Sequence, residues 1–232
     1  NFYEWSIGNN GHSELFNKDS DSPRSDLILN CALVYSLEKT KELFSVAEID
    51  DNDNFSCHFE RIDSIRAAIC REFYDSESGI FKASTRDDLP ASVLGNAFAL
   101  LIGLGDERAL SAVKGERGLT PATLSMMTFV YDAIIRFEGE EKAKGYILSD
   151  IEKNYSYMLK NGATSFWETI NGEKDFGNAG SLCHGWSAIP TYIYFRYCLG
   201  IYPDGLAQIS KHDVIPETIS GVYEAKTDYF DN

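Results

Sequence analysis

The sequence has few basic residues and no apolar run long enough to cross a membrane. Its richest apolar stretch, residues 93–104, is shorter than the roughly 18–20 residues that a membrane helix requires. The 21 Lys and Arg residues against 36 Asp and Glu give a net charge of −15, which repels the phosphates of nucleic acids and of anionic lipids. We therefore expect neither nucleic acid nor a membrane as a partner.

Cysteine is also scarce, and its pattern excludes a disulfide-based fold. Disulfide frameworks are typical of much smaller secreted chains with an even number of cysteines. This chain has an odd number of cysteines at irregular spacings. We expect them to be buried free thiols: Cys31, Cys57, Cys70, Cys183 and Cys198. Two of these cysteines precede a histidine, but neither pair has the CxxC or HxxxH partner of a zinc site. We therefore expect no metal.

Motifs for cofactor-dependent and nucleophilic chemistry are missing as well. The chain has no G-x-S-x-G motif, no phosphate-binding loop and no dinucleotide fingerprint. Serine-hydrolase, kinase and Rossmann chemistry therefore have no support, and we expect no cofactor. The first residues, NFYEWSIGNNG, contain no basic or apolar segment typical of a targeting signal, so we assign no compartment.

What the sequence does contain is a series of helical patterns. Some segments are apolar around most of their circumference, which predicts inner helices covered by their neighbours; these are residues 26–44, 91–104, 120–137 and 181–199. A single apolar stripe predicts outer, half-solvated helices at residues 59–73 and 140–160. With a short helix at 107–114, the patterns predict an all-α domain of about three antiparallel helical hairpins.

Signals for strands are few and short. The segments GIFKAS, ATSFWET and VIPETISGVYEA have the composition of strands. Thr120 followed by Pro121 is typical of a capped helix start. We expect the helical domain to span residues 1–203, and we interpret the less packed tail, residues 204–232, as the start of a truncated β region.

The candidate site lies in the stretch GATSFWETINGEKDFGNAGSLCHGWSAIP, residues 162–190. Glu168 follows Trp167 in a glycine-flanked connection, and His184 and Trp186 open the next predicted helix. Aromatic rings stack on the apolar face of sugars while a carboxylate activates water, so we expect these four side chains to form one concave sugar site. The alternative for each is structural: a loop Glu beside a half-buried Trp, a helix-start His and a core Trp.

Two further positions are candidates for binding a sugar. Glu4 and Trp5, in the segment FYEW, repeat the pairing of an acid with an aromatic ring near the start of the chain. Asn96 is a polar residue in the middle of an apolar helix and therefore needs hydrogen-bond partners. The alternative for Asn96 is a packing amide that is bonded to a neighbouring loop.

These segments carry a resemblance to a known family. GATSFWET, followed by GSLCHGWSAIPTYIYFRYCLGIYP, resembles the C-terminal hairpin of the six-hairpin glycosidase domain of bacterial α-L-rhamnosidases. FYEW, GNAFALLIGL and TLSMMTFVYDAI are similar to earlier segments of that domain. The resemblance spans about residues 2–203.

The resemblance implies a fold, an activity and site residues. The fold is an (α/α) toroid of the six-hairpin glycosidase type, and the activity is inverting hydrolysis of a terminal sugar such as α-L-rhamnose. Glu168 corresponds to the general base and His184 to a sugar contact. Glu4 and Trp5 correspond to residues that line the same pocket.

The chain also departs from the family pattern. Family members carry the general acid upstream of the FxEW-like segment, which is where this chain begins, and three hairpins make about half of a six-hairpin toroid. We therefore expect the chain to be the C-terminal part of a catalytic domain, with another chain or the missing N-terminal part covering the open toroid.

Two other functions stay open from the sequence. A non-catalytic carbohydrate-binding or structural half-toroid would share the aromatic surface and would lack the acid by nature. A polysaccharide lyase on a similar toroid would take an acidic sugar, and the net charge of −15 disfavours a polyanionic substrate.

Overall fold

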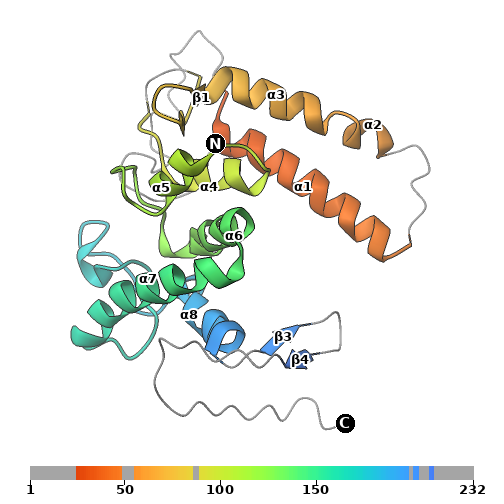
Figure 1. Cartoon of the computed structure of the whole chain (residues 1–232). Coiled ribbons are helices and arrows are strands. Elements are labelled where there is room, and N and C mark those ends of the chain that lie inside the picture. The colour runs from red at the N-terminus through yellow and green to blue at the C-terminus, as the bar shows by residue number, and fades with distance from the viewer. Residues whose placement is uncertain (1–24, 49–54, 86–88, 199–200, 204–208, 212–232) are drawn as a thin grey trace. The chain divides into compact units, whose positions relative to one another are not determined.

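The computed structural model describes residues 25–48, 55–85, 89–198, 201–203 and 209–211, and these are mostly helical (Figure 1). The chain divides into two units, Asn1–Glu140 and Glu141–Asn232. Within the described residues, no helix is long and apolar enough to cross a membrane.

The first unit consists of six helices and one short hairpin among the described residues. In chain order the helices are α1 (Leu27–Val46), α2 (Ser56–Phe59), α3 (Ile62–Phe73), α4 (Val93–Leu101), α5 (Glu107–Val113) and α6 (Met127–Glu138). A 3-10 turn, η1 (Leu124–Met126), precedes α6, and the strands β1 (Tyr74–Asp75) and β2 (Ile80–Phe81) form the hairpin.

Helix α4 is the centre of this unit, as its apolar circumference predicts. Every residue of α4 is buried, and the helix packs against α1, α5 and α6. The Ser92 hydroxyl caps its start by accepting the Gly95 N–H at 3.0 Å. A Cβ on Gly95 would lie 3.1 Å from a methyl of Leu27, so the glycine allows α1 to approach closely.

The outer helix α3 buries the apolar stripe that its sequence predicts, whereas α1 is less buried than its sequence predicts. Ile62, Ile69 and Phe73 are buried on one face of α3, so this prediction is confirmed. In α1 only Leu27, Cys31 and Val34 are buried. Several large apolar side chains on α1 are exposed instead: Leu29, Leu33, Leu43 and Val46. Within the described chain, neighbours therefore do not cover most of α1, and its apolar side chains stay bare, as expected for an inner helix of an open toroid.

The GIFKAS prediction is confirmed by the β1–β2 hairpin. Tyr74 pairs with Phe81 and Asp75 with Ile80 in an antiparallel register. Gly79 takes a positive φ of 74° in the turn. The hairpin brings the backbone of Phe81 against α4.

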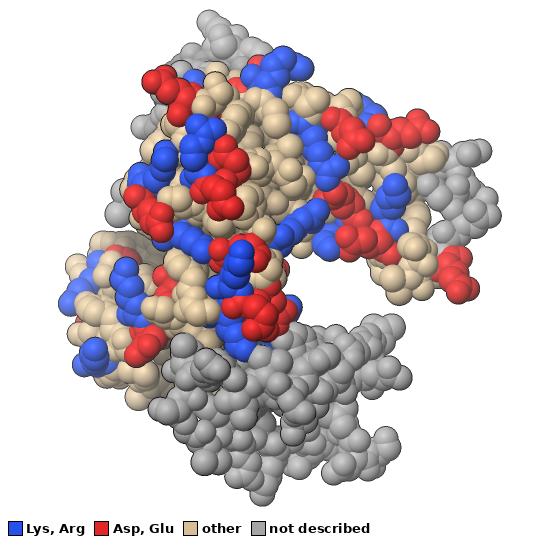
Figure 2. All heavy atoms as spheres, viewed as in Figure 1, with Lys and Arg blue, Asp and Glu red and all other residues tan. Residues whose placement is uncertain are grey.

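Ion pairs also join helices of the first unit. Lys114, after the end of α5, lies 2.7 Å from the carboxylate of Glu138 at the end of α6. Arg66 on α3 pairs with Glu38 on α1 and donates to the carbonyl of Ile102 at 2.9 Å. In the described part of the surface, acidic and basic side chains are interspersed (Figure 2).

The predicted helix start at Thr120 is wrong. Thr120 forms a parallel bridge with Ser92: its carbonyl accepts the Val93 N–H at 2.9 Å, and its N–H donates to Ala91 at 3.1 Å. These bonds hold Thr120 in extended chain beside the start of α4. The helical turn therefore begins later, at Leu124.

The second unit opens with α7 (Glu140–Lys160), whose bounds match the predicted outer helix. Its buried stripe includes Ile147, Tyr155 and Met158. The elements after α7 are short: η2 (Gly172–Lys174), η3 (Gly185–Ser187), α8 (Ile189–Ile193), the π-helical turn η4 (Tyr194–Cys198), β3 (Ile201–Pro203) and β4 (Ile209–Lys211).

The predicted last helix, residues 181–199, begins later than expected. Helix α8 starts at Ile189 with Pro190 in its first turn, where a missing N–H costs no hydrogen bond. Residues 181–184 are not helical, and two of them bond the preceding chain: the Ser181 carbonyl accepts from Glu168, and the His184 N–H donates to Phe166. The two apolar residues of this segment, Leu182 and Cys183, are exposed, so they do not belong to a buried helix face.

The described part of the C-terminal region forms a short pair of strands. Strand β3 pairs antiparallel with β4, with Ile201 opposite Lys211. The predicted strand at 214–225 lies outside the described residues.

The cysteines differ in burial. Cys31 is buried, and burial raises the pKa of its thiol. Cys57 and Cys183 are free but exposed, so the prediction of burial is wrong for these two thiols.

Candidate functional site

Two segments of the second unit, residues 166–168 and 181–184, lie side by side in the fold. The Glu168 N–H donates to the Ser181 carbonyl at 2.9 Å, and the His184 N–H donates to the Phe166 carbonyl at 2.7 Å. The segment ATSFWET is thus not a strand, although Phe166 and Glu168 bond the backbone of the later segment. Glu168 thus lies opposite Ser181, and His184 lies opposite Phe166, although a long loop separates the two segments.

Glycines allow this loop to return on itself. Gly172 has a φ of +59°, and a Cβ there would lie 2.6 Å from the Trp167 indole. A Cβ on Gly180 would lie 2.0 Å from the Gly172 carbonyl oxygen. Any side chain at either position would displace the loop, so the glycine-rich composition is a requirement of its closure.

The Glu168 carboxylate is half-buried and has one hydrogen bond with the described residues. Its Oε2 accepts the Ser181 N–H at 3.0 Å. Among the described residues, Glu168 forms no ion pair with Lys, Arg or His. The carboxylate therefore keeps a second oxygen that can accept a proton from water or bind a hydroxyl.

Trp167 is anchored by a chain of hydrogen bonds rather than exposed for stacking. The Ser187 hydroxyl donates to the Trp167 carbonyl at 2.5 Å, and the Tyr155 hydroxyl donates to the Ser187 carbonyl at 2.6 Å. Burial raises the pKa of Tyr155 above its usual value. The Trp167 side chain is only 8% exposed. The anchor fixes the backbone immediately before Glu168.

His184 and Trp186 form an aromatic pair at the start of η3. Their ring centroids are 4.1 Å apart, with an angle of 37° between the planes. Trp186 is 45% exposed, so one side of the pair faces solvent. An exposed indole beside an imidazole provides a stacking surface and a hydrogen-bond donor for a sugar.

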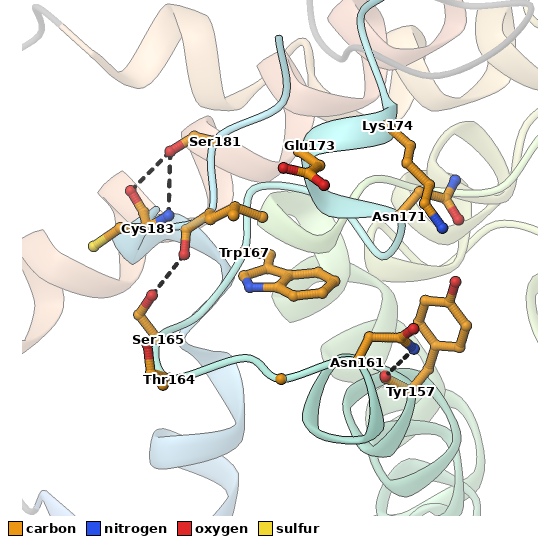
Figure 3. Close-up of a pocket in the computed structure, with 12 residues that line it drawn as sticks. Tyr157, Asn161, Thr164, Ser165, Trp167, Asn171, Glu173, Lys174, Ser181 and Cys183 are labelled. Carbon is orange, nitrogen blue, oxygen red and sulfur yellow. Dashed lines mark hydrogen bonds between the residues drawn. The ribbon is translucent and has the colours of Figure 1, made fainter. Parts of the chain in front are cut away.

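A pocket of about 620 Å³ lies in the same unit (Figure 3). It is lined by the end of α7, the Trp167 segment, η2 and residues 181–183. Of the four predicted residues only Trp167 lines it, so this pocket is not the predicted shared site. The convergence of Glu168, His184 and Trp186 on one sugar stays a prediction.

Sequence reasoning missed most of the side chains that line this pocket. Tyr157 and Asn161 stand one helical turn apart at the end of α7, directly before the glycine-flanked loop. Asn171 and Lys174 lie inside the quoted stretch, around η2. A polar and aromatic helix end followed by such a loop is the signal that could have found them.

The remaining predicted residues have separate outcomes. Asn96 is fully buried, and its amide bonds the backbone N–H and carbonyl of Phe81 at 2.9 and 3.2 Å and the Ser92 carbonyl at 3.0 Å. The prediction of Asn96 as a sugar contact is therefore corrected to a packing amide. Glu4 and Trp5 lie outside the described residues. Within the described ranges, no three His, Cys, Asp or Glu side chains are grouped to hold a metal ion.

Comparison with known proteins adds a family to this geometry. The family model described as the bacterial alpha-L-rhamnosidase 6 hairpin glycosidase domain matches residues 4–198. Among solved structures, the chain is similar to a rhamnosidase from Klebsiella oxytoca with rhamnose bound, at 16% identity and a TM-score of 0.61. It is also similar to a GH78 family rhamnosidase of Bacillus sp. GL1, at 23% identity and a TM-score of 0.63.

These similarities differ in what they cover. The two alignments include 83% and 84% of this chain, but the chain spans only 35% and 20% of those two proteins. At these identities the likeness shows the fold, and the predicted all-α class of the six-hairpin type is confirmed. No curated protein matches the chain. Since the family model covers most of its residues, the chain belongs to the family of bacterial α-L-rhamnosidase six-hairpin glycosidase domains.

Proposed function

We propose that the chain is the C-terminal part of the catalytic domain of an inverting glycoside hydrolase that removes a terminal sugar such as α-L-rhamnose. The observation that carries this proposal is Glu168: a half-buried carboxylate without an ion pair in the described chain, held by Ser181 inside the family-matched segment. The chain spans about a third or less of the rhamnosidases it resembles, so the activity is proposed for the whole protein.

Glu168 acts as the general base in this proposal. It takes a proton from water while the water oxygen attacks the anomeric carbon, and a second carboxylic acid gives its proton to the leaving oxygen. An inverting pair of carboxyl groups is about 6.5–9.5 Å apart, which leaves room for the water. We assign the acid to a segment outside this chain.

The aromatic pair binds the sugar in the same proposal. The exposed face of Trp186 stacks on the ring, and His184 donates a hydrogen bond to a hydroxyl. The anchored Trp167 positions Glu168 through the backbone. On the resemblance, we assign Glu4 and Trp5 to the same pocket.

The first expected result is turnover with inversion. The full polypeptide that contains this chain should hydrolyse an aryl α-L-rhamnoside and first release β-L-rhamnose, because water attacks the face opposite the leaving group. Proton NMR during the first minutes distinguishes the anomers before they equilibrate. Release of the α-anomer would contradict inversion, and an aryl β-D-glucoside serves as the control substrate.

A second candidate function has one observation in its favour. The Glu168 carboxylate already bonds the Ser181 N–H, which is a structural role in closing the loop. A non-catalytic carbohydrate-binding domain needs no more than this. Rhamnose binding without turnover in the full polypeptide would support this alternative.

The exposed leucines of α1 support the partial-toroid part of the proposal. Leu33 is 49% exposed and Leu43 61% exposed, and contiguous bare apolar surface is uncommon on monomers. We propose that further helices, from the same polypeptide or another chain, cover this face.

Substitution of Leu33 tests whether the α1 face is covered. In the full polypeptide, Leu33→Ala should lower the free energy of unfolding by about 2 kcal/mol or more, as for buried leucines. Lys41→Ala, an exposed position on the same helix, should change it by less than about 0.5 kcal/mol. Urea denaturation measures both, and equally small effects would mean that α1 is solvated in the whole protein.

A further inference from the structure

We propose that the pocket beside Trp167 is a second carbohydrate-binding site, separate from Glu168, that takes a neutral pyranose ring of a glycan. Its volume of about 620 Å³ falls within the roughly 300–1,000 Å³ typical of small-ligand sites. All of its lining residues belong to the second unit. The inference does not depend on Glu168 acting as a base.

One exposed aromatic side chain supplies the apolar contact. Tyr157, near the end of α7, is 39% exposed, so its ring is available for stacking on the C–H face of a sugar. Figure 3 shows the Trp167 indole in the middle of the pocket, between Glu173 and the pair formed by Tyr157 and Asn161. Gly172 lies close to the indole, since a Cβ there would come within 2.6 Å of the ring.

Polar side chains around these rings match the hydroxyls of a sugar. Asn161 donates its amide to the Tyr157 carbonyl at 2.8 Å, and Asn171 donates to Asp175 at 3.1 Å. Both amides keep an oxygen that can accept from a hydroxyl. Exposed Glu173 adds two acceptor oxygens and exposed Lys174 adds donors. Such a set of donors and acceptors suits a ring whose hydroxyls do both.

The charges favour a neutral ligand over an acidic one. Glu173 and Lys174 are adjacent and opposite in sign, so their fields largely cancel at the pocket. The chain as a whole carries −15, which disfavours anions approaching from solvent. A phosphate or a uronic acid therefore gains little here, whereas hydroxyl hydrogen bonds are unaffected.

This pocket adjoins Glu168 but does not include it. Ser181, whose N–H donates to the Glu168 carboxylate at 3.0 Å, is one of the lining residues. Trp167 lines the pocket, while Phe166 packs against the Tyr155 ring at 6.0 Å and Glu168 does not line the pocket. A sugar in the pocket would thus contact Trp167 and not Glu168.

Cys183 offers a direct readout because it is a free, exposed thiol that lines the pocket. Its alkylation by iodoacetamide, followed by mass spectrometry of the full polypeptide, should slow when methyl α-L-rhamnoside, methyl β-D-glucoside or methyl β-D-galactoside is added. At the concentration that half-fills the site, the rate should fall by about half. Cys57, free and exposed in the first unit, is the internal control and should react at an unchanged rate.

Variants decide whether the pocket itself binds the glycoside. Tyr157→Ala should abolish the protection of Cys183, Tyr157→Phe should keep it, and Leu159→Ala, exposed on the same helix outside the pocket, should keep it. Glu168→Gln should also keep it, so failure of the proposed hydrolysis and failure of this site are distinguishable. Equal slowing at both thiols, protection that survives Tyr157→Ala, no protection by any glycoside, or protection by galacturonate alone would each overturn the proposal.

Discussion

Replacing Glu168 by glutamine is expected to lower turnover of an aryl α-L-rhamnoside about 10²–10⁴-fold, the usual contribution of a general base. Glutamine has the same shape and retains an oxygen for the Ser181 N–H that now bonds Oε2 at 3.0 Å. The loop should therefore stay closed. What the amide cannot do is take a proton from the attacking water.

Kinetics on the full polypeptide test this expectation. The loss should fall on kcat while KM changes little, because the sugar contacts from His184 and Trp186 remain. Glu152→Gln, an exposed position on α7, is the matched control and should retain full turnover. If Glu168→Gln were as active as the unsubstituted enzyme, the assignment of the base would be wrong and the structural role of the carboxylate would stand alone.

Asn96→Ala is expected to give the largest loss of stability. The substitution leaves the buried N–H and carbonyl of Phe81 without partners, and each unpaired buried group costs about 1–3 kcal/mol. The free energy of unfolding should therefore fall by about 2–5 kcal/mol. The hairpin β1–β2 would lose its attachment to α4.

Denaturant unfolding and a graded variant check the Asn96 expectation. Asn96→Asp keeps an acceptor for the Phe81 N–H but removes the two donated bonds, so it should destabilise as well. Thr128→Ala, exposed on α6, should change the free energy of unfolding by less than about 0.5 kcal/mol. If Asn96→Ala changed the free energy of unfolding by less than about 0.5 kcal/mol, water would have to reach the Phe81 backbone and replace the hydrogen bonds of the amide.

Local apolar patterns correctly predicted the helices that bury a single face against their neighbours. The apolar stripe of residues 140–160 predicted both ends of α7, and the stripe of residues 59–73 predicted the buried face of α3. Both helices bury one face against neighbours, so hydrophobic periodicity carries the necessary information. The same pattern failed at residues 181–184, because Ser181 and His184 bond the backbone of a distant segment and Leu182 and Cys183 are exposed.

The candidate site was predictable in its residue types but not in its geometry. Carboxylate, indole and imidazole in one glycine-rich stretch indicated a sugar site. The stretch did not reveal that Glu168 bonds the backbone of Ser181, 13 residues away. It also did not reveal that Trp167 lines a pocket from which Glu168 is absent. Which face each side chain takes depends on the pairing of two distant segments.

The amino-acid order alone therefore established the all-α class, the outer helices and the chemical character of the loop, since these follow from periodicity and composition over short spans. Folding in three dimensions settled the roles of Asn96 and Thr120 and the late start of α8. In each case a backbone group found its partner far away in the chain: Phe81 for Asn96, Val93 for Thr120 and Phe166 for His184. Such bonds form because a buried polar group must be paired, and local sequence does not specify which distant group is within reach.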